Sequence, residues 1–172
     1  MKDLIIYYSH IGENWVDGGL KIIDKGNTEI VAEKLANLTG ADLFKVEEVK
    51  PYPVGYHDCC NVAKDELNRN FRPEIKQKLD TIENYNTIYI CTPIWWNHMP
   101  MPMFTLLEGL NFNGKSVKFI VTHEGSALGD IPSDIEKLCD GATINPGLAI
   151  KGSTAMECDD KLSSWILNES IN

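Results

Sequence analysis

Cysteine is scarce in this sequence, and its arrangement excludes the common cysteine-based folds. The chain of 172 residues has five cysteines, an odd number, with Cys59 and Cys60 adjacent and no CxxC pair. A disulfide framework, a zinc ribbon and a thioredoxin-type redox site are therefore not expected. The motifs GxSxG and GxxxxGK(S/T) are also absent, which excludes a serine hydrolase elbow and a P-loop.

Long apolar runs are absent as well. The apolar stretch near the N-terminus, Leu4 to Tyr8, is too short for a signal sequence, and no later run approaches the length of a membrane span. We therefore expect a cytoplasmic protein without a membrane partner.

Positive charge is in short supply. The chain has 16 lysines and arginines against 25 aspartates and glutamates, which gives a formal net charge of −9. An acidic surface repels nucleic-acid phosphates, so nucleic acid is not expected as a partner. The same charge suits docking to a basic protein through an acidic face, although acidity for solubility alone explains it equally well.

The sequence does contain a regular alternation of strand-like and helix-like segments. Its length and its hydrophobic fraction of 43% fit one domain, residues 1–172. Short apolar runs predict strands, and helical spacing with start and stop residues predicts helices. The expected strands are 4–8, 41–49, 87–91, 117–121 and 148–150, and the expected helices are 27–39, 59–70, 102–110, 131–139 and 159–169, with a further short helix at 73–79.

This alternation predicts parallel βαβ units with right-handed crossovers. We predict an α/β fold, a three-layer, doubly wound, five-stranded parallel sheet with strand order 2-1-3-4-5. Residues 11–25 depart from the pattern, because they form a long insertion between the first strand and its helix, where about 2–6 residues are usual. Loops of that length are usually functional or disordered.

The loop after the first strand has the character of a phosphate site. Ligands of open parallel sheets bind outside the carboxyl ends of the strands. Ser9 and His10 stand at this end of the first strand, and Asn27 and Thr28 begin the helix beyond the insertion. Free amides and the positive dipole end of a helix favour a phosphate. An ordinary helix cap is the alternative for Asn27 or Thr28.

The loops after the third and fourth strands suit an aromatic ring and its polar edge. Tryptophans beside prolines form a stiff shelf for a flat heteroaromatic ring, although core or interface anchoring would also explain them. Glycine amides and hydroxyls can bond a polar ring edge, although a flexible turn is the alternative. The residues are Pro93, Ile94, Trp95, Trp96, Asn97 and His98 in the first of these loops, and Thr122, His123, Glu124, Gly125 and Gly129 in the second.

The three loops together predict FMN, which has a phosphate, a flat ring and a polar pyrimidine edge. Three of the four histidines, His10, His98 and His123, fall on this edge of the sheet. A zinc site is the alternative for them, but no carboxylate-rich ligand spacing accompanies them, and we assign no metal ligands. No residue is assigned as catalytic, because a flavin itself performs the redox chemistry.

The chain resembles a bacterial flavodoxin family over nearly its whole length. The matching segments occur in the same order: DLIIYYS, KGNTEIVAEKLANLTGADLFKVEEVKPYP, TPIWWNHMPMPMFTLLE and THEGSALGDIPSDIEKLC. The resemblance implies a flavodoxin-like fold and FMN as the cofactor. It implies Ser9, Asn27 and Thr28 at the phosphate, residues 93–98 at the isoalloxazine ring, and Thr122, His123, Glu124, Gly125 and Gly129 at its pyrimidine side.

Two features depart from that family. Simple flavodoxins keep the positions of Ser9 and Gly26 close in sequence, whereas residues 11–25 intervene here. Trp15 in this insertion either anchors the loop to the domain, which we favour, or lies on the flavin or on a partner. Asn97 stands where such proteins often have glycine; asparagine tolerates positive φ better than most residues, but the peptide flip that glycine permits there is left open.

The resemblance favours one function over two others. We predict a low-potential electron carrier that passes electrons between redox partner proteins and docks through its acidic face. The alternative is an NAD(P)H-dependent, FMN-containing quinone or flavin reductase, whose substrate pocket the insertion and the histidines would build. A cofactor-free binding module or a metal hydrolase on the same fold is the third hypothesis, because fold alone does not define function.

Overall fold

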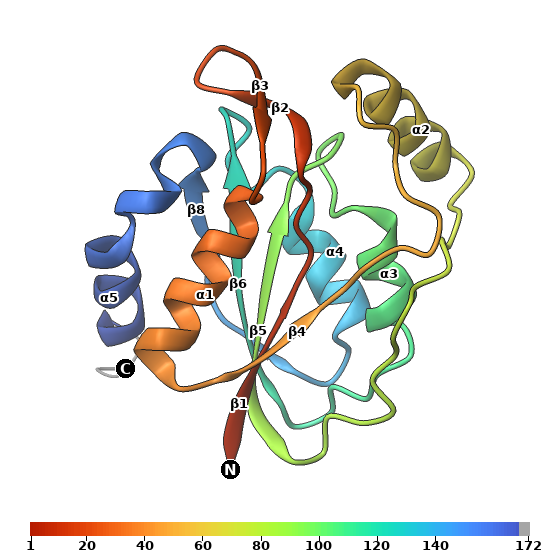
Figure 1. Ribbon diagram of the computed structural model, residues 1–172. Helices are drawn as coiled ribbons and strands as arrows, with labels where there is room; N and C mark the ends of the chain where they lie inside the picture. The colour runs from red at the N-terminus through yellow and green to blue at the C-terminus, as the bar shows by residue number, and fades with distance from the viewer. Residues whose placement is uncertain (169–172) are drawn as a thin grey trace.

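The computed structural model describes residues 1–168, and its centre is a parallel sheet (Figure 1). The strand order is β4-β1-β5-β6, and β7 and β8 both pair with β6 in parallel. The strands are β1 (Lys2–Tyr7), β4 (Asp42–Lys45), β5 (Tyr85–Pro93), β6 (Ser116–His123), β7 (Thr143–Ile144) and β8 (Leu148–Lys151). The predicted order 2-1-3-4-5 is confirmed, but the outer position holds two short strands, so the described sheet has six strands instead of five.

Helices cover both faces of the sheet. On one face lie α1 (Asn27–Thr39) and α5 (Asp159–Asn168), and on the other lie α3 (Met101–Leu107) and α4 (Ile131–Leu138) (Figure 1). A fifth helix, α2 (Tyr56–Asn68), lies beside the carboxyl end of the sheet, and a 3-10 helix, η1 (Gly152–Glu157), follows β8. The three-layer α/β prediction is therefore confirmed.

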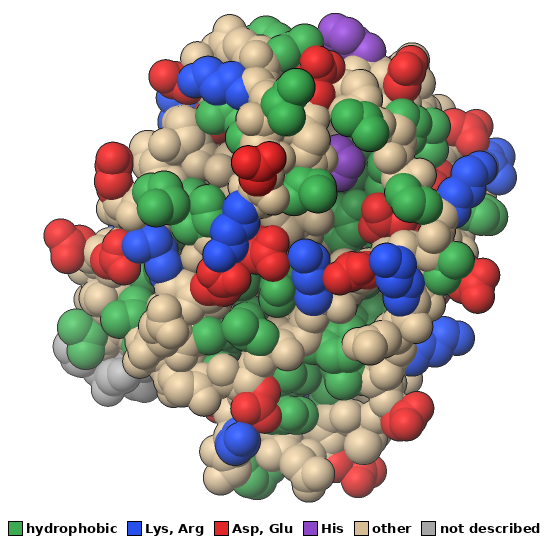
Figure 2. Space-filling model, in the orientation of Figure 1, with side chains coloured by type: hydrophobic (Ala, Val, Ile, Leu, Met, Phe, Trp, Pro, Cys, Tyr) green, Lys and Arg blue, Asp and Glu red, His purple; other side chains and the backbone are tan. Residues whose placement is uncertain are grey.

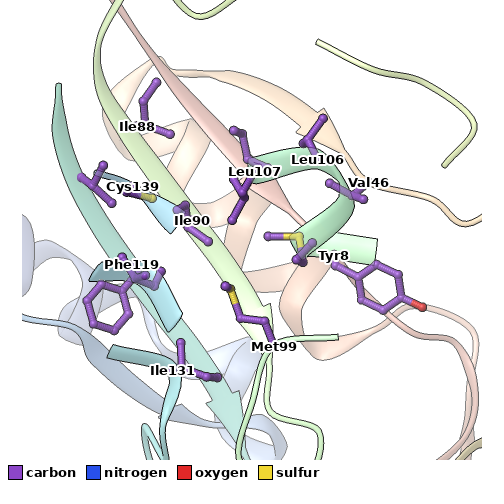
Figure 3. Close-up of a cluster of buried hydrophobic side chains, with 14 of the residues drawn as sticks. Tyr8, Val46, Ile88, Ile90, Met99, Leu106, Leu107, Phe119, Ile131 and Cys139 are labelled. Atoms are coloured by element: carbon purple, nitrogen blue, oxygen red, sulfur yellow. The ribbon is translucent and has the colours of Figure 1, made fainter. Parts of the chain in front are cut away.

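Each face of the sheet has its own core, because side chains alternate along a strand. In β1, Ile5 and Tyr7 pack in the cluster that includes Val31 and Leu35 of α1. The larger cluster on the opposite face contains Leu4 and Ile6 (Figure 3). Figure 3 labels ten members of that cluster: Tyr8, Val46, Ile88, Ile90, Met99, Leu106, Leu107, Phe119, Ile131 and Cys139. Burial on both faces explains why the strands read as continuous apolar runs.

The long insertion is an ordered β-hairpin. Its strands β2 (Gly12–Val16) and β3 (Gly19–Ile23) pair only with each other, in antiparallel register. The connecting residues Asp17 and Gly18 have φ of 50° and 80°. Positive φ at both central residues is typical of a type I′ turn, for which Asp-Gly is a favoured pair. The hairpin rises above the carboxyl end of the sheet (Figure 1).

Residues 73–79 are not helical, which corrects the sequence prediction. The amide of Val49 donates to the carbonyl of Glu74, and the amide of Lys76 donates to that of Glu47. These bonds hold the segment extended and bury Ile75. Because the segment finds its backbone partners in a distant part of the chain, local propensity does not decide its conformation.

Several predicted boundaries also shift. The second strand is Asp42–Lys45 and not 41–49, and α2 begins at Tyr56 and not at Cys59. Glu169, the last residue of the final predicted helix, lies outside the described residues. Within residues 1–168 no helix is long and apolar enough to cross a membrane. The five cysteines are all free thiols.

Candidate functional site

A cavity of about 700 Å³ opens at the carboxyl end of the sheet. Its inner wall comes from the three loops identified in the sequence, and its outer wall comes from the hairpin and α2. Figure 2 shows hydrophobic side chains around the hollow between these two elements. The lining residues that the sequence predicted are His10, Asn27, Thr28, Pro93, Ile94, Trp95, Trp96, Asn97, Thr122, His123 and Glu124. The structure therefore brings together most of the predicted cofactor residues, although they come from three separate loops.

The first loop forms a tight cradle at the N-terminus of α1. The Ser9 hydroxyl accepts a hydrogen bond from the amide of Glu29 at 3.1 Å, so Ser9 caps the helix and does not itself line the cavity. A Cβ at Gly26 would overlap Ser9 Oγ. The hydroxyls of Thr28 and Thr122 are 2.7 Å apart and buried, which ties the first loop to the third. The first amides of a helix have no partner within it, so this end can accept an anion.

His10 presents an unsatisfied nitrogen beside the cavity. Its Nε2 is buried and has no hydrogen-bond partner in the described part of the chain. Burial lowers the pKa of His10, and the nearby Glu48 carboxylate opposes this effect. A buried nitrogen without a hydrogen-bond partner is costly unless a ligand bonds to it. The cavity thus fits a ligand with a polar group at this wall.

The second loop is a two-residue turn between Trp95 and His98. The amide of each of these residues donates to the carbonyl of the other, at 2.8 and 3.1 Å. The central residues Trp96 and Asn97 have φ of 52° and 69°. Such a conformation is uncommon for a bulky aromatic residue, and backbone strain of this kind persists only where the surroundings enforce it. Here the Asn97 carbonyl accepts from the amide of Asp130 at 2.9 Å.

Trp95 and Trp96 make different contacts in the cavity wall. The Trp95 ring meets those of Tyr8, His10 and Tyr52 edge-on, with centroids 5.0 to 5.5 Å away. The Trp96 side chain is 46% exposed. Its Nε1 donates to the carbonyl of Cys60 at 2.9 Å, so it links the turn to α2. Trp95 is thus a rigid floor residue, and Trp96 is a bridge between the second loop and the outer wall.

The third loop is held by the side chain of Glu124. Its Oε1 accepts from the amide of Ser153 at 2.8 Å, and its Oε2 accepts from the amide of Asp17 at 3.3 Å. The hairpin tip is therefore attached to this loop. His123 Nδ1 accepts from the amide of Gly125 at 2.9 Å, and burial lowers the pKa of His123.

Two glycines of the third loop do not line the cavity, but one of them shapes it. Neither Gly125 nor Gly129 is among the lining residues. A Cβ at Gly129 would lie 2.5 Å from Ile94 Cδ1 and 2.9 Å from the carbonyl oxygen of Asn97. Gly129 therefore lets the third loop approach the turn of the second loop closely.

The structure directs His98 away from the cavity. Its Nδ1 lies 2.9 Å from a carboxylate oxygen of Asp134 on α4, and its Nε2 lies 3.7 Å from Asp130. The amide of Met99 also donates to Asp134, at 3.3 Å. Burial raises the pKa of Asp134, and the hydrogen bond with His98 opposes that rise. His98 thus anchors one end of the turn to the scaffold.

We expect His98→Ala to lower the free energy of unfolding by about 2 kcal/mol. The change leaves the carboxylate of Asp134, whose side chain is 7% exposed, without its imidazole partner. Asp130→Ala is the matched control, because that carboxylate is 62% exposed, and we expect a cost below about 1 kcal/mol. Urea unfolding measures both. Equal stability of the two variants would contradict the anchoring role.

The sequence assigned no residue of the outer wall to the cofactor site, although it raised the insertion as a possible wall of a substrate pocket. The hairpin contributes Glu13, Asn14 and Trp15, and α2 contributes Tyr56, His57, Cys59, Cys60, Asn61 and Ala63. Gly152 also lines the cavity. The Asp-Gly pair at 17–18 was the available signal for the hairpin. Nothing local in the sequence of α2 indicates that it packs over the end of the sheet.

The cavity has the donor set of an organic-cofactor site. In residues 1–168 no group of three or more His, Cys, Asp or Glu side chains is placed to hold a metal ion. A helix N-terminus, an aromatic floor and the polar third loop instead meet at the carboxyl edge of a parallel sheet of order 2-1-3-4-5. These features define the flavodoxin-like class of α/β proteins.

Comparison with known proteins agrees with this class. Residues 22–169 match the model of a family described as Flavodoxin, and the chain belongs to this family. No curated protein matches the sequence. The family and the fold are those of flavoproteins.

Solved structures share the fold over nearly the whole chain. A protein assigned as a flavoprotein from Bacteroides eggerthii DSM 20697 is 25% identical with a TM-score of 0.75, and the alignment covers 99% of each chain. A flavoprotein from Lactobacillus acidophilus NCFM, in complex with FMN, is 25% identical with a TM-score of 0.64, and covers 94% of this chain and 98% of its own. The Trp repressor binding protein of Bacillus subtilis is 14% identical with a TM-score of 0.57, and the alignment covers 95% of this chain and 96% of its own. At this identity the likeness shows the fold alone.

Proposed function

We propose that the protein binds FMN in this cavity and carries electrons at low potential between redox partner proteins. The observation that carries the proposal is the meeting of an α1 N-terminus, the Trp95 floor and the third loop in one cavity of about 700 Å³. That volume is within the usual range of small-molecule sites. The structural relative from Lactobacillus acidophilus, solved with FMN, supports the choice of this flavin.

Each wall of the cavity has a role in holding the cofactor. The amides at the start of α1, with Asn27 and Thr28, would hold the phosphate. Trp95 would support the ring, and the orphaned Nε2 of His10 would form a hydrogen bond with a polar group of the ligand. The amides around His123 and Glu124 would face the pyrimidine edge. When bound, the flavin supplies the electron-transfer chemistry, and the protein supplies binding, orientation and electrostatics.

The acidic surface supports docking to a basic redox partner. The formal net charge is −9, and opposite charge on a partner speeds encounter. Glu13 and Glu124 line the cavity, and Asp17 lies in the hairpin turn, where its amide donates to Glu124. We therefore place the docking face over the mouth of the cavity. The cytoplasm is the proposed compartment, since free thiols suit a reducing environment.

The first test is the absorption spectrum and flavin specificity of the purified protein. We expect a yellow protein that takes up FMN and binds riboflavin at least tenfold more weakly, because riboflavin lacks the phosphate that the helix N-terminus would hold. Fluorescence titration of flavin-free protein measures both affinities. A colourless protein that takes up no FMN from a large excess would overturn the proposal.

The outer wall of the cavity favours a second candidate, an NAD(P)H-dependent FMN-containing quinone or flavin reductase. The hairpin and α2 give the cavity walls that a shuttle without a substrate does not need. Mixing the FMN-loaded protein with NADPH in a stopped-flow instrument separates the two candidates. Slow bleaching of the flavin supports the carrier, and rapid bleaching supports the reductase.

A further inference from the structure

The cavity has an outer wall that the three cofactor loops do not supply, and we call the space beside this wall the outer compartment. The hairpin and α2 form its wall through Trp15, Tyr56, His57, Cys60 and Asn61. None of these residues belongs to the three loops that the proposed function assigns to FMN. The aromatic and polar side chains of this wall indicate which ligand the outer compartment would bind.

Two aromatic rings from different elements meet in this wall. The centroids of Trp15 and Tyr56 are 6.2 Å apart, and their planes are tilted by 40°. Trp15 is nevertheless 44% exposed, so part of its ring remains free for another contact. Aromatic surfaces of this kind stack on or pack beside flat rings.

Backbone hydrogen bonds hold the aromatic wall in place. Glu13 Oε1 accepts from the amide of Tyr56 at 2.9 Å, and the amide of Glu13 donates to the carbonyl of Val54 at 3.3 Å. At the other end of the hairpin, Asp17 bonds to Glu124 through its amide and lies 3.4 Å from Lys151 Nζ. The hairpin is therefore fixed on both sides of the cavity. A binding surface that is already ordered loses little conformational entropy when a ligand arrives.

The charge of the compartment selects between ligand classes. No lysine or arginine is among the residues lining the cavity. The carboxylates of Glu13 and Glu124 accept backbone amides, which hold them in the cavity wall, and their negative charge disfavours an anionic ligand. A phosphate-bearing dinucleotide would find no countercharge beside Trp15, whereas a neutral ring loses little solvation there.

We propose that this outer compartment binds a neutral, planar aromatic molecule, which shares the cavity with the flavin and is covered by Trp15 and Tyr56. The imidazole of His57 and the amide of Asn61 lie in the same wall and supply hydrogen bonds for a hydroxyl or carbonyl group. The inference rests on the proposed function, because the flavin occupies the inner part of the cavity. It assigns the hairpin a ligand-binding role.

Equilibrium dialysis of 2-naphthol against the FMN-loaded protein tests the inference. We expect saturable binding of one molecule per chain, and binding of naphthalene-2-sulfonate and NADP⁺ at least tenfold more weakly, since both are anionic. Trp15→Ala should weaken 2-naphthol at least tenfold and FMN less than threefold. Leu20→Ala is the matched control. Leu20 pairs with Trp15 across the hairpin and is 41% exposed, but it does not line the cavity.

Each outcome decides between the two proposals. Uptake of FMN without saturable 2-naphthol binding overturns this inference and leaves the proposed function standing. A loss of FMN affinity in Trp15→Ala as large as the loss of 2-naphthol affinity also overturns it, because Trp15 would then cover the flavin itself. Equal effects of Trp15→Ala and Leu20→Ala would do the same. Failure of the wild-type protein to bind FMN removes both proposals.

Discussion

Gly26→Ala is expected to lose at least tenfold in affinity for FMN and about 1–3 kcal/mol of stability. The added Cβ would overlap Ser9 Oγ and lie 2.9 Å from the carbonyl oxygen of His10. Because the Ser9 hydroxyl also caps α1 at the amide of Glu29, the first loop and the helix would have to separate. This movement opens the cradle in which the phosphate is expected. Fluorescence titration with FMN and urea unfolding measure the two effects.

Gly55→Ala is the matched control for this change. Gly55 precedes α2 as Gly26 precedes α1, and their backbones are alike, with φ and ψ of −70° and 135° against −68° and 148°. A Cβ at Gly55 meets only Asp58 Oδ2, at 3.8 Å, which is ordinary contact. We expect it to change stability and FMN affinity little. If Gly26→Ala binds FMN as well as Gly55→Ala does, the first loop does not hold the phosphate.

Trp95→Ala is expected to have the largest effect on both stability and flavin binding. The centroid of its ring lies 5.0 Å from that of Tyr52 and 5.5 Å from that of Tyr8, so removal of the ring leaves a gap in the floor of the cavity. Replacement of a packed tryptophan costs about 3 kcal/mol or more. Loss of the ring as a support for flavin should cost a further 1–3 kcal/mol of FMN binding energy, roughly 5- to 150-fold in affinity.

Trp165→Ala separates the loss of packing from the loss of ligand contact. Trp165 lies on α5 on the opposite face of the sheet, where its ring is 6.1 Å from that of Tyr89, and it does not line the cavity. We expect this variant to be destabilised and to retain wild-type FMN affinity. Chemical unfolding and FMN titration are compared for both variants. Wild-type FMN affinity in Trp95→Ala would remove Trp95 from the site.

The sequence predicted the sheet well because its strands are buried on both faces. Apolar runs such as Leu4 to Tyr8 are typical of strands in a covered parallel sheet, and right-handed crossovers then restrict the topology. The segment at 73–79 was predicted wrongly because its hydrogen-bond partners lie at Glu47 and Val49, far away in sequence. Local propensity carries no information about such pairing.

The inner wall of the site was predictable for the same topological reason. The loops after parallel strands open at one edge, so Thr28, Trp95 and Thr122 could be placed together from the strand order alone. The direction of individual side chains could not be predicted. His98 follows the same strand as Trp95, yet it turns toward Asp134 because a buried carboxylate requires a hydrogen-bond partner.

The amino-acid sequence by itself determined the alternation of strands and helices, because hydrophobic periodicity is a local signal. The strand order, and with it the edge at which the three loops meet, followed from the doubly wound class to which this alternation belongs. Only the tertiary structure decided that the insertion is a hairpin fixed to Tyr56 and Glu124, and that α2 closes the outer side of the cavity. The physical reason is that these elements are held by contacts between residues distant in sequence, such as the hydrogen bond from Asp17 to Glu124, and such contacts leave no periodic pattern in the chain.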